Sequence, residues 1–322
     1  MTRTVSLLLL AALGLAPLAA CKKHQGPDVA FLLSTLQEER YQKDVKYFEQ
    51  RAGELGLHTI TLAADNDNAK QIAQVEDALN QGAKVLVIQP TDSQAASSYV
   101  RLAHEHGAKV VAYDRAIVSP DLDFYVSHDS YKVGVLQAQA AIAATGGKGK
   151  YVLLAGQAGH SVATEITRGY KDTLAPYSAV TIVHEGHDAN ALGAVDAVLA
   201  TSSRLARAAV AAAGSTQVFI AGADADAENV NLVCQGKQAI EVLKDVEPLA
   251  RTAAETAKQL LDGATPAAGS SIALAGKSVP VAAVRVEVVT PDNVKPLLVD
   301  TGFLSADELP ACKNRLAAVR YR

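Results

Sequence analysis

The sequence predicts an α/β fold with two doubly wound parallel-sheet domains. Short, nearly continuous apolar segments alternate with longer segments of helical periodicity, the pattern of a parallel sheet covered by helices on both faces. The helical segments stop at glycines such as Gly56, Gly82 and Gly107, the residue type that most often ends a helix. A length of 322 residues exceeds one typical core and suits two domains.

The first part of the chain contains four predicted strands separated by three predicted helices. The strands are runs rich in Val, Leu, Ile and Ala, at 28–34, 58–64, 85–89 and 109–113. The first helix, 41–55, places Phe48 and Leu55 on one apolar face. A second helix is expected at 69–79 and a third at 92–106, so the segment reads as a repeated βα unit.

A second series of the same kind begins near residue 124. Further strands are expected at 150–155, 180–184 and 216–221, with a late extended segment at 279–289. Helices are expected at 131–144, 163–174 and 247–261. The two series predict two domains that face each other across a cleft.

The N-terminus has the features of an export signal. Met1–Arg3 is basic, 4–16 is apolar but too short to span a membrane, and Leu18-Ala-Ala-Cys21 resembles the lipobox of bacterial lipoproteins. We therefore expect a signal peptide at 1–20, acylation of Cys21 that anchors the chain in a bilayer, and a tether at 21–27. The alternative is an ordinary secretory leader with an incidental cysteine.

Charge and cysteine content narrow the function. There are 30 Lys and Arg against 34 Asp and Glu, and removing 1–20 takes away only Arg3, so the net charge goes from −4 to −5. Because the signs are interspersed and no basic stripe occurs, nucleic acid is not an expected partner. Cys234 and Cys312 are left either as a disulfide or as two buried thiols, and neither has metal-ligand spacing.

Asp114 and Arg115 follow the predicted strand 109–113 directly. In an open α/β sheet the carboxyl ends of the strands are where ligands bind. A carboxylate beside a guanidinium offers acceptors and forked donors to a small polyhydroxylated molecule. Taken alone, the pair is better explained as a surface ion pair at a strand–loop junction.

Several motifs, in order along the chain, resemble the bacterial sugar-binding proteins of ABC transporters, and within them the branch that binds D-xylose. The motifs are Glu39-Arg-Tyr-Gln-Lys-Asp44, Val85-Leu-Val-Ile-Gln-Pro90, Ala112-Tyr-Asp-Arg115, Asp123-Phe-Tyr-Val-Ser127, Lys132-Val-Gly-Val-Leu-Gln-Ala138, Gly222-Ala-Asp-Ala-Asp226 and Val242-Leu-Lys244. The resemblance implies a type I periplasmic binding protein whose domains are joined by a three-segment hinge. It implies domains at 28–122 plus 246–278 and at 123–245 plus 279–305, with a C-terminal tail at 306–322.

The resemblance also implies a set of ligand-binding residues. They are Arg40, Tyr41, Asp114, Arg115, His187, Asp224 and Lys244. Some have simpler explanations: Tyr41 could be core packing, Asp224 a helix cap, and Lys244 an exposed lysine.

The second domain departs from the family pattern. His187 stands where the family has a stacking tryptophan, Ser202 where it has an asparagine, and His160 lies where it has paired amides. The interval 188–214 is also short, so 194–201 is either a strand with little chain left for a crossover or part of one helix, 190–213. We expect this domain to be short of one βα unit.

These features predict a lipid-anchored, monomeric, extracytoplasmic protein that captures a monosaccharide for an ABC permease, with no cofactor and no metal. The alternative is a sensing or degenerate lipoprotein that acts through a membrane receptor. No nucleophile elbow, phosphate-binding loop or zinc-protease motif occurs, which argues against an enzyme. The spacing His184-Glu-Gly-His187 permits a metal site, but a pair of histidines in a strand-to-loop turn is more often incidental.

Overall fold

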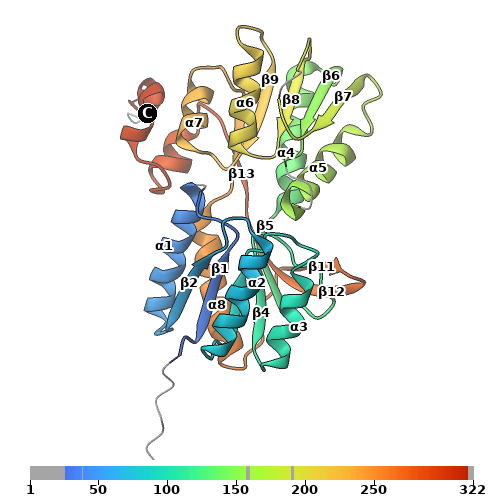
Figure 1. Cartoon of the computed structure of the whole chain (residues 1–322). Coiled ribbons are helices and arrows are strands. Elements are labelled where there is room, and N and C mark those ends of the chain that lie inside the picture. The colour runs from blue at the N-terminus through green and yellow to red at the C-terminus, as the bar shows by residue number, and fades with distance from the viewer. Residues whose placement is uncertain (1–25, 38, 157–159, 190–191, 318–322) are drawn as a thin grey trace, which may run out of the picture.

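The chain forms two α/β domains, one above the other in Figure 1, with mainly parallel sheets of seven and six strands. The computed structural model describes residues 26–37, 39–156, 160–189 and 192–317. The architecture confirms the predicted fold class of two doubly wound domains.

The first domain contains a sheet in the order β11-β12-β5-β4-β3-β1-β2, in which only β11 runs antiparallel to its neighbour. Its strands are β1 Val29–Leu33, β2 Thr59–Ala63, β3 Val85–Ile88, β4 Lys109–Tyr113, β5 Phe124–His128, β11 Ser270–Leu274 and β12 Lys277–Val284. Its helices are α1 Glu39–Glu54, α2 Asn68–Asn80, α3 Ser97–Glu105 and α8 Val246–Leu261. α1 and α8 bury Phe48 and Leu249 against one face of the sheet, and α2 and α3 bury Val75 and Tyr99 against the other.

The second domain contains a sheet in the order β13-β10-β9-β8-β6-β7, with β13 antiparallel to β10. Its strands are β6 Gly149–Leu154, β7 Val180–Gly186, β8 Ala197–Ala200, β9 Phe219–Ala223, β10 Ile240–Leu243 and β13 Glu287–Val289. Its helices are α4 Ser130–Thr145, α5 Ser161–Leu174, α6 Ser203–Ala213 and α7 Ala227–Cys234. α4 and α5 pack closely because Gly134 has no side chain. A Cβ at this position would lie 2.0 Å from the Ile166 carbonyl oxygen.

The chain crosses between the domains three times, after β5, after β10 and after β12. The boundaries expected at 122/123 and 278/279 are wrong. β5 pairs with β4, and β12 pairs with β5, so both strands belong to the first sheet. The expected extended segment 279–289 is in fact the end of β12 and all of β13, one on each side of the third crossing.

The segment between β7 and β8 decides between the two alternatives for 188–214. Ala197–Ala200 is a strand between β6 and β9, so the sheet keeps this strand and the expected loss of a whole βα unit is wrong. Among the described residues 187–189 and 192–196 there is no helix. Ala189, Leu192 and Val195 instead pack directly against the sheet face that a helix would cover.

The C-terminal segment belongs to the second domain, which corrects the expected tail at 306–322 for its described part. It comprises a π-turn η1 Lys295–Val299, the 3₁₀ turns η2 Ala306–Glu308 and η3 Pro310–Cys312, and α9 Lys313–Ala317. Leu298 and Leu309 are buried against α7, and a disulfide joins Cys234 to Cys312. The structure thus answers the question that the sequence left open for these two cysteines.

None of the helices in the described ranges is long and apolar enough to cross a membrane. The expected signal peptide, and Cys21 with most of its tether, lie outside the described residues.

Replacing Cys234 and Cys312 with serine should lower the free energy of unfolding. The disulfide closes a loop of 78 residues, and releasing such a loop costs about 4 kcal/mol by chain entropy. Denaturant unfolding with and without reductant measures this. Reductant should destabilise the unmodified protein and leave the Cys234→Ser, Cys312→Ser variant unchanged; equal stability of the two proteins without reductant contradicts the prediction.

Candidate functional site

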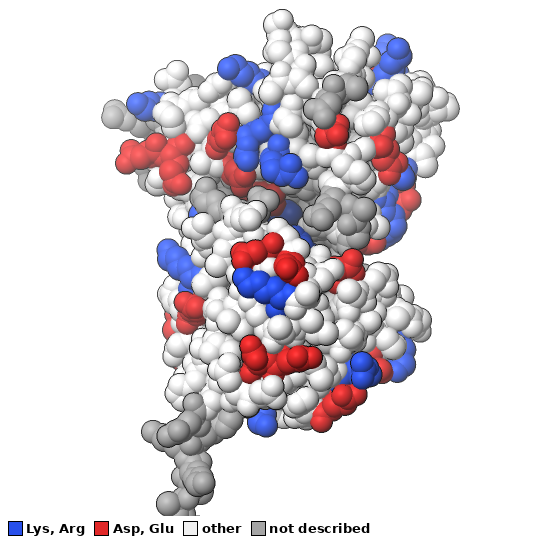
Figure 2. Space-filling model, in the orientation of Figure 1, with Lys and Arg blue, Asp and Glu red and all other residues white. Residues whose placement is uncertain are grey.

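A cavity of about 150 Å³ lies between the two domains. It is formed where strands end and helices begin, and it lies in the groove between the upper and lower domains in Figure 2. Six of the seven predicted ligand-binding residues line it: Arg40, Tyr41, Asp114, Arg115, Asp224 and Lys244.

Asp114 is directed into the cavity by an unusual backbone. It follows β4 with φ 59°, a left-handed conformation that aspartate tolerates better than most residues. Its N–H donates to the Val126 carbonyl at 2.8 Å, and its own carbonyl accepts from the Tyr125 and Ser127 hydroxyls at 2.8 and 2.9 Å. Strand β5 therefore fixes this residue.

Asp224 occupies the corresponding place in the second domain. It follows β9 with φ 107°, and its N–H donates to the Val242 carbonyl of β10 at 3.0 Å. Asp226 and not Asp224 stands at the N-cap position of α7, and Asp224 lines the cavity. Each sheet thus presents one aspartate just beyond the end of a central strand.

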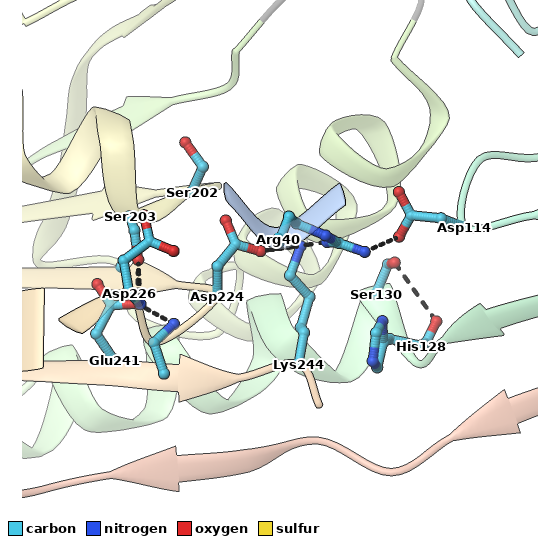
Figure 3. A network of polar contacts seen from close by, with 12 residues as sticks. Arg40, Asp114, His128, Ser130, Ser202, Ser203, Asp224, Asp226, Glu241 and Lys244 are labelled. Atoms are coloured by element: carbon cyan, nitrogen blue, oxygen red, sulfur yellow. Dashed lines mark hydrogen bonds and ion pairs between the residues drawn. The ribbon is translucent and has the colours of Figure 1, made fainter. Parts of the chain in front are cut away.

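Arg40 connects these two aspartates. Its guanidinium lies 3.1 Å from the Asp114 carboxylate and 3.4 Å from the Asp224 carboxylate (Figure 3), and 3.6 Å from Asp44 one turn along α1. Burial opposes ionisation of Asp114, but the charges of Arg40 and Lys244 hold the pKa of its carboxyl well below the ordinary value. Asp114 therefore remains a carboxylate at neutral pH.

Lys244 is buried rather than exposed, in contrast to the alternative that the sequence left open. Its side chain is 5% exposed, and its ammonium lies 2.7 Å from the Asp224 carboxylate. It follows β10 at the second crossing between the domains, so this ion pair lies beside the hinge.

Arg115 and Tyr41 form a second pair in the cavity wall. The Arg115 guanidinium donates to the Tyr41 hydroxyl and to the Pro90 carbonyl, both at 3.2 Å. The Nε of Arg115 is buried without a hydrogen-bond partner among the described residues. Tyr41 is buried, yet it also lines the cavity, so packing and ligand contact are compatible roles.

His187 does not line the cavity, which corrects its predicted position. Its Nδ1 contacts the Gly156 carbonyl, and the residue lines a separate surface hollow beside α5. Just before His187, the register of β7 shifts between the partners of Tyr151 and Val152, and the described residues 187–189 and 192–196 that follow contain no helix.

The second-domain wall of the cavity is formed by His160, Thr201, Ser202 and Arg204 instead. His160 and Ser202 were noted only as departures from the family pattern, and Arg204 was missed. Arg204 lies in the first turn of α6. This position could not be predicted, because the sequence did not show where between 190 and 213 a helix would begin. Burial, with the charge of Arg115, lowers the pKa of His160 to about 3, so its ring is neutral and can donate or accept.

A buried carboxyl supports the Asp224 loop from behind. Glu241, on β10, accepts hydrogen bonds from the Ala225 N–H at 3.0 Å and the Ser203 hydroxyl at 2.9 Å, and Gln238 donates at 2.5 Å (Figure 3 shows Glu241 and Ser203). Ala225 also has a positive φ of 61°. Glu241 therefore links the loop that carries Asp224 to the start of α6.

No group of three or more histidine, cysteine or acidic side chains in the described ranges is arranged to hold a metal ion. The cavity combines hydroxyl-binding carboxylates with cationic donors and one aromatic ring. Such a set of side chains can hold a polar molecule through hydrogen bonds and charge.

Comparison with known proteins gives a consistent assignment. Residues 29–265 match the periplasmic binding protein domain family. The chain is 32% identical to the D-xylose-binding periplasmic protein of Escherichia coli K12, over 87% of this chain and 92% of that protein. It is 28% identical to the multiple sugar-binding periplasmic receptor of Rhizobium radiobacter, over 96% of this chain and 100% of the receptor.

A solved structure also resembles most of the chain. A carbohydrate transporter solute-binding protein from Chloroflexus aurantiacus, in complex with D-glucose, superimposes with a TM-score of 0.80 at 27% identity. The match covers 89% of this chain and 100% of that one.

The stability of the protein should fall as the pH rises toward 8. Burial raises the pKa of Glu241 from 4.5 to about 8, so near neutrality the folded state holds a proton that the unfolded chain has released. The free energy of unfolding should therefore drop by roughly 1 kcal/mol per pH unit between about pH 6.5 and 8, then level off. Glu241→Gln should lack this slope, whereas Glu105→Gln, an exposed control, should keep it. Identical slopes in all three proteins contradict the prediction.

Proposed function

Since this chain belongs to the periplasmic sugar-binding proteins of ABC transporters, we propose that it captures one monosaccharide between its domains and delivers it to a membrane permease. Proteins of this family bind a solute without transforming it, so the chain is a binding protein and not an enzyme. The ligand that we propose is a pyranose related to xylose.

The observation that carries the proposal is the contact of Arg40 with both aspartates. Arg40 and Asp114 come from the first domain and Asp224 comes from the second, so one largely enclosed guanidinium, 12% exposed, contacts carboxylates of both. Sugar hydroxyls donate to carboxylates and accept from guanidinium and ammonium groups. A pyranose at this place would be contacted by both domains at once, which favours the closed arrangement.

The hinge makes such closure possible. In the part of the chain that the structure describes, three segments connect the domains, and Lys244 lies in the middle one with its ammonium 2.7 Å from the Asp224 carboxylate. A ligand that engages Asp224 therefore acts beside the axis about which the domains move.

We also propose that Cys21 is acylated and anchors the protein at the outer face of a membrane. The apolar leader, the residues Leu18-Ala-Ala before Cys21, and a disulfide typical of oxidising compartments support this arrangement.

A second candidate function is sensing through a membrane receptor. The second domain favours it, because its β7–β8 connection has no helix in the described residues and β7 leaves Ile182 and Val183 40% and 46% exposed. Neighbouring genes distinguish the two candidates: permease and ATPase genes support transport, whereas a histidine kinase or chemoreceptor gene supports sensing.

Replacing Asp114 with asparagine should weaken monosaccharide binding about tenfold to a hundredfold. A hydrogen bond to a charged group contributes about 1.5–3 kcal/mol, and the ligand would lose its carboxylate acceptor. Calorimetric titration with pentoses, hexoses and sugar acids measures the effect, and thermal unfolding without sugar checks the fold. Asp121→Asn, which removes an exposed ion pair to Lys277, is the matched control and should bind normally. Equal affinities of the two variants contradict the assigned site.

Replacing Cys21 with serine should release the protein from the membrane. A thioether-linked lipid requires the cysteine sulfur, and the chain has no membrane-spanning helix in its described part. Fractionation of the producing cells should find the unmodified protein with membranes and Cys21→Ser in the soluble fraction. Retention of the variant on membranes contradicts acylation at this residue.

A further inference from the structure

Some of the charged side chains that line the cavity form ion pairs with one another, and others do not. Arg40 and Lys244 are paired with Asp114 and Asp224. Asp226, at the edge of the cavity, is paired with Arg207 at 3.0 Å. Arg115 and Arg204 also line the cavity, and neither forms an ion pair with any residue that the structure describes.

Arg115 is the stronger of these two observations. It is 8% exposed, its guanidinium donates only to the neutral Tyr41 hydroxyl and Pro90 carbonyl, and its Nε has no acceptor within the described ranges. The neighbouring Asp114 carboxylate partly balances this charge, but no carboxylate among the described residues lies within ion-pair distance of the Arg115 guanidinium. A guanidinium still able to donate is suited to a carboxylate.

The surroundings of Arg115 increase the positive potential. The Ala116 N–H donates to the Ser161 hydroxyl at 2.9 Å, so the first turn of α5 lies against the chain just after Arg115. The N-terminus of a helix carries partial positive charge. Its neighbour His160 is neutral and has a buried Nδ1 without a described partner, so this side chain supplies no counter-charge to the guanidinium.

Arg204 adds a second cation from the second domain. It lies in the first turn of α6, where the helix dipole disfavours a positive charge. Ser202 caps this helix by accepting from the Leu205 N–H, which leaves Arg204 without a role in the cap. On the face shown in Figure 2, basic side chains of the upper domain stand directly above the groove.

We propose that the ligand is an acidic monosaccharide whose carboxylate is held between Arg115 and Arg204. Its hydroxyls would lie toward Asp114, Asp224, Arg40 and Lys244, and its carboxylate toward the starts of α5 and α6. The proposal rests on the proposed function, since it names the class of sugar that the same cavity selects.

Two series of sugars isolate the carboxylate. D-Glucuronate, D-glucose and D-xylose share one ring configuration and differ only at C5, which carries a carboxylate, a hydroxymethyl group or hydrogen. D-Galacturonate, D-galactose and L-arabinose form a second such series. Calorimetric titration of the full mature chain should give at least tenfold tighter binding for the acid of one series than for both of its neutral partners, and added salt should reduce this preference.

Variants assign the preference to the two arginines. Arg204→Gln and Arg115→Gln should each lower the affinity for the acid and reduce the ratio of acid to neutral binding. Arg101→Gln, which changes an exposed arginine of α3, should keep the ratio. Thermal unfolding without sugar identifies any variant that does not fold.

The outcomes separate this inference from the proposed function. Neutral sugars that bind as tightly as their acids overturn the acidic ligand and leave monosaccharide capture supported. An acid preference that persists in both arginine variants overturns the assigned carboxylate position. No binding of any neutral or acidic sugar overturns both proposals.

Discussion

The arrangement of the two domains depends on one guanidinium that lies between them. Arg40 contacts Asp114 and Asp224, which follow central strands of different sheets, and it is also within ion-pair distance of Asp44. Without this cation, two carboxylates at the bottom of the groove would repel each other in a medium of low dielectric constant. Its position in turn requires that both aspartates adopt positive φ, and the neighbouring strands β5 and β10 hold them there through hydrogen bonds to Val126 and Val242.

The sequence allowed the first-domain half of the site to be predicted because that half follows simple rules. Asp114 and Arg115 come directly after an apolar run, and Arg40 begins the helix after the first strand. Asp224 follows from the same rule in the second domain. The burial of Lys244 could not be read from its neighbours, because it results from a crossing between domains that brings residues distant in sequence together.

The errors have equally specific causes. An apolar strand pattern does not say which sheet the strand joins, so 124–128 and 279–284 were placed in the wrong domain. His187 lies outside the cavity after a bulge in β7, next to a connection with no helix among its described residues, and neither feature leaves a pattern in a single sequence. Arg204 was missed because 190–213 could be read as one alanine-rich helix, whereas Gly214 and Ser202 delimit a shorter one, α6.

The three crossings also constrain how this protein can reach its native state. The last strand of the first sheet, β12, ends at Val284, and α8, which covers one face of that sheet, begins only at Val246. The first domain therefore cannot complete its core until nearly the whole chain, including the second domain, is available. For a protein that passes through a membrane before folding, this order postpones the native state until export is almost finished. The interleaved topology thus keeps the first domain from folding while the chain still has to cross the membrane in an unfolded state.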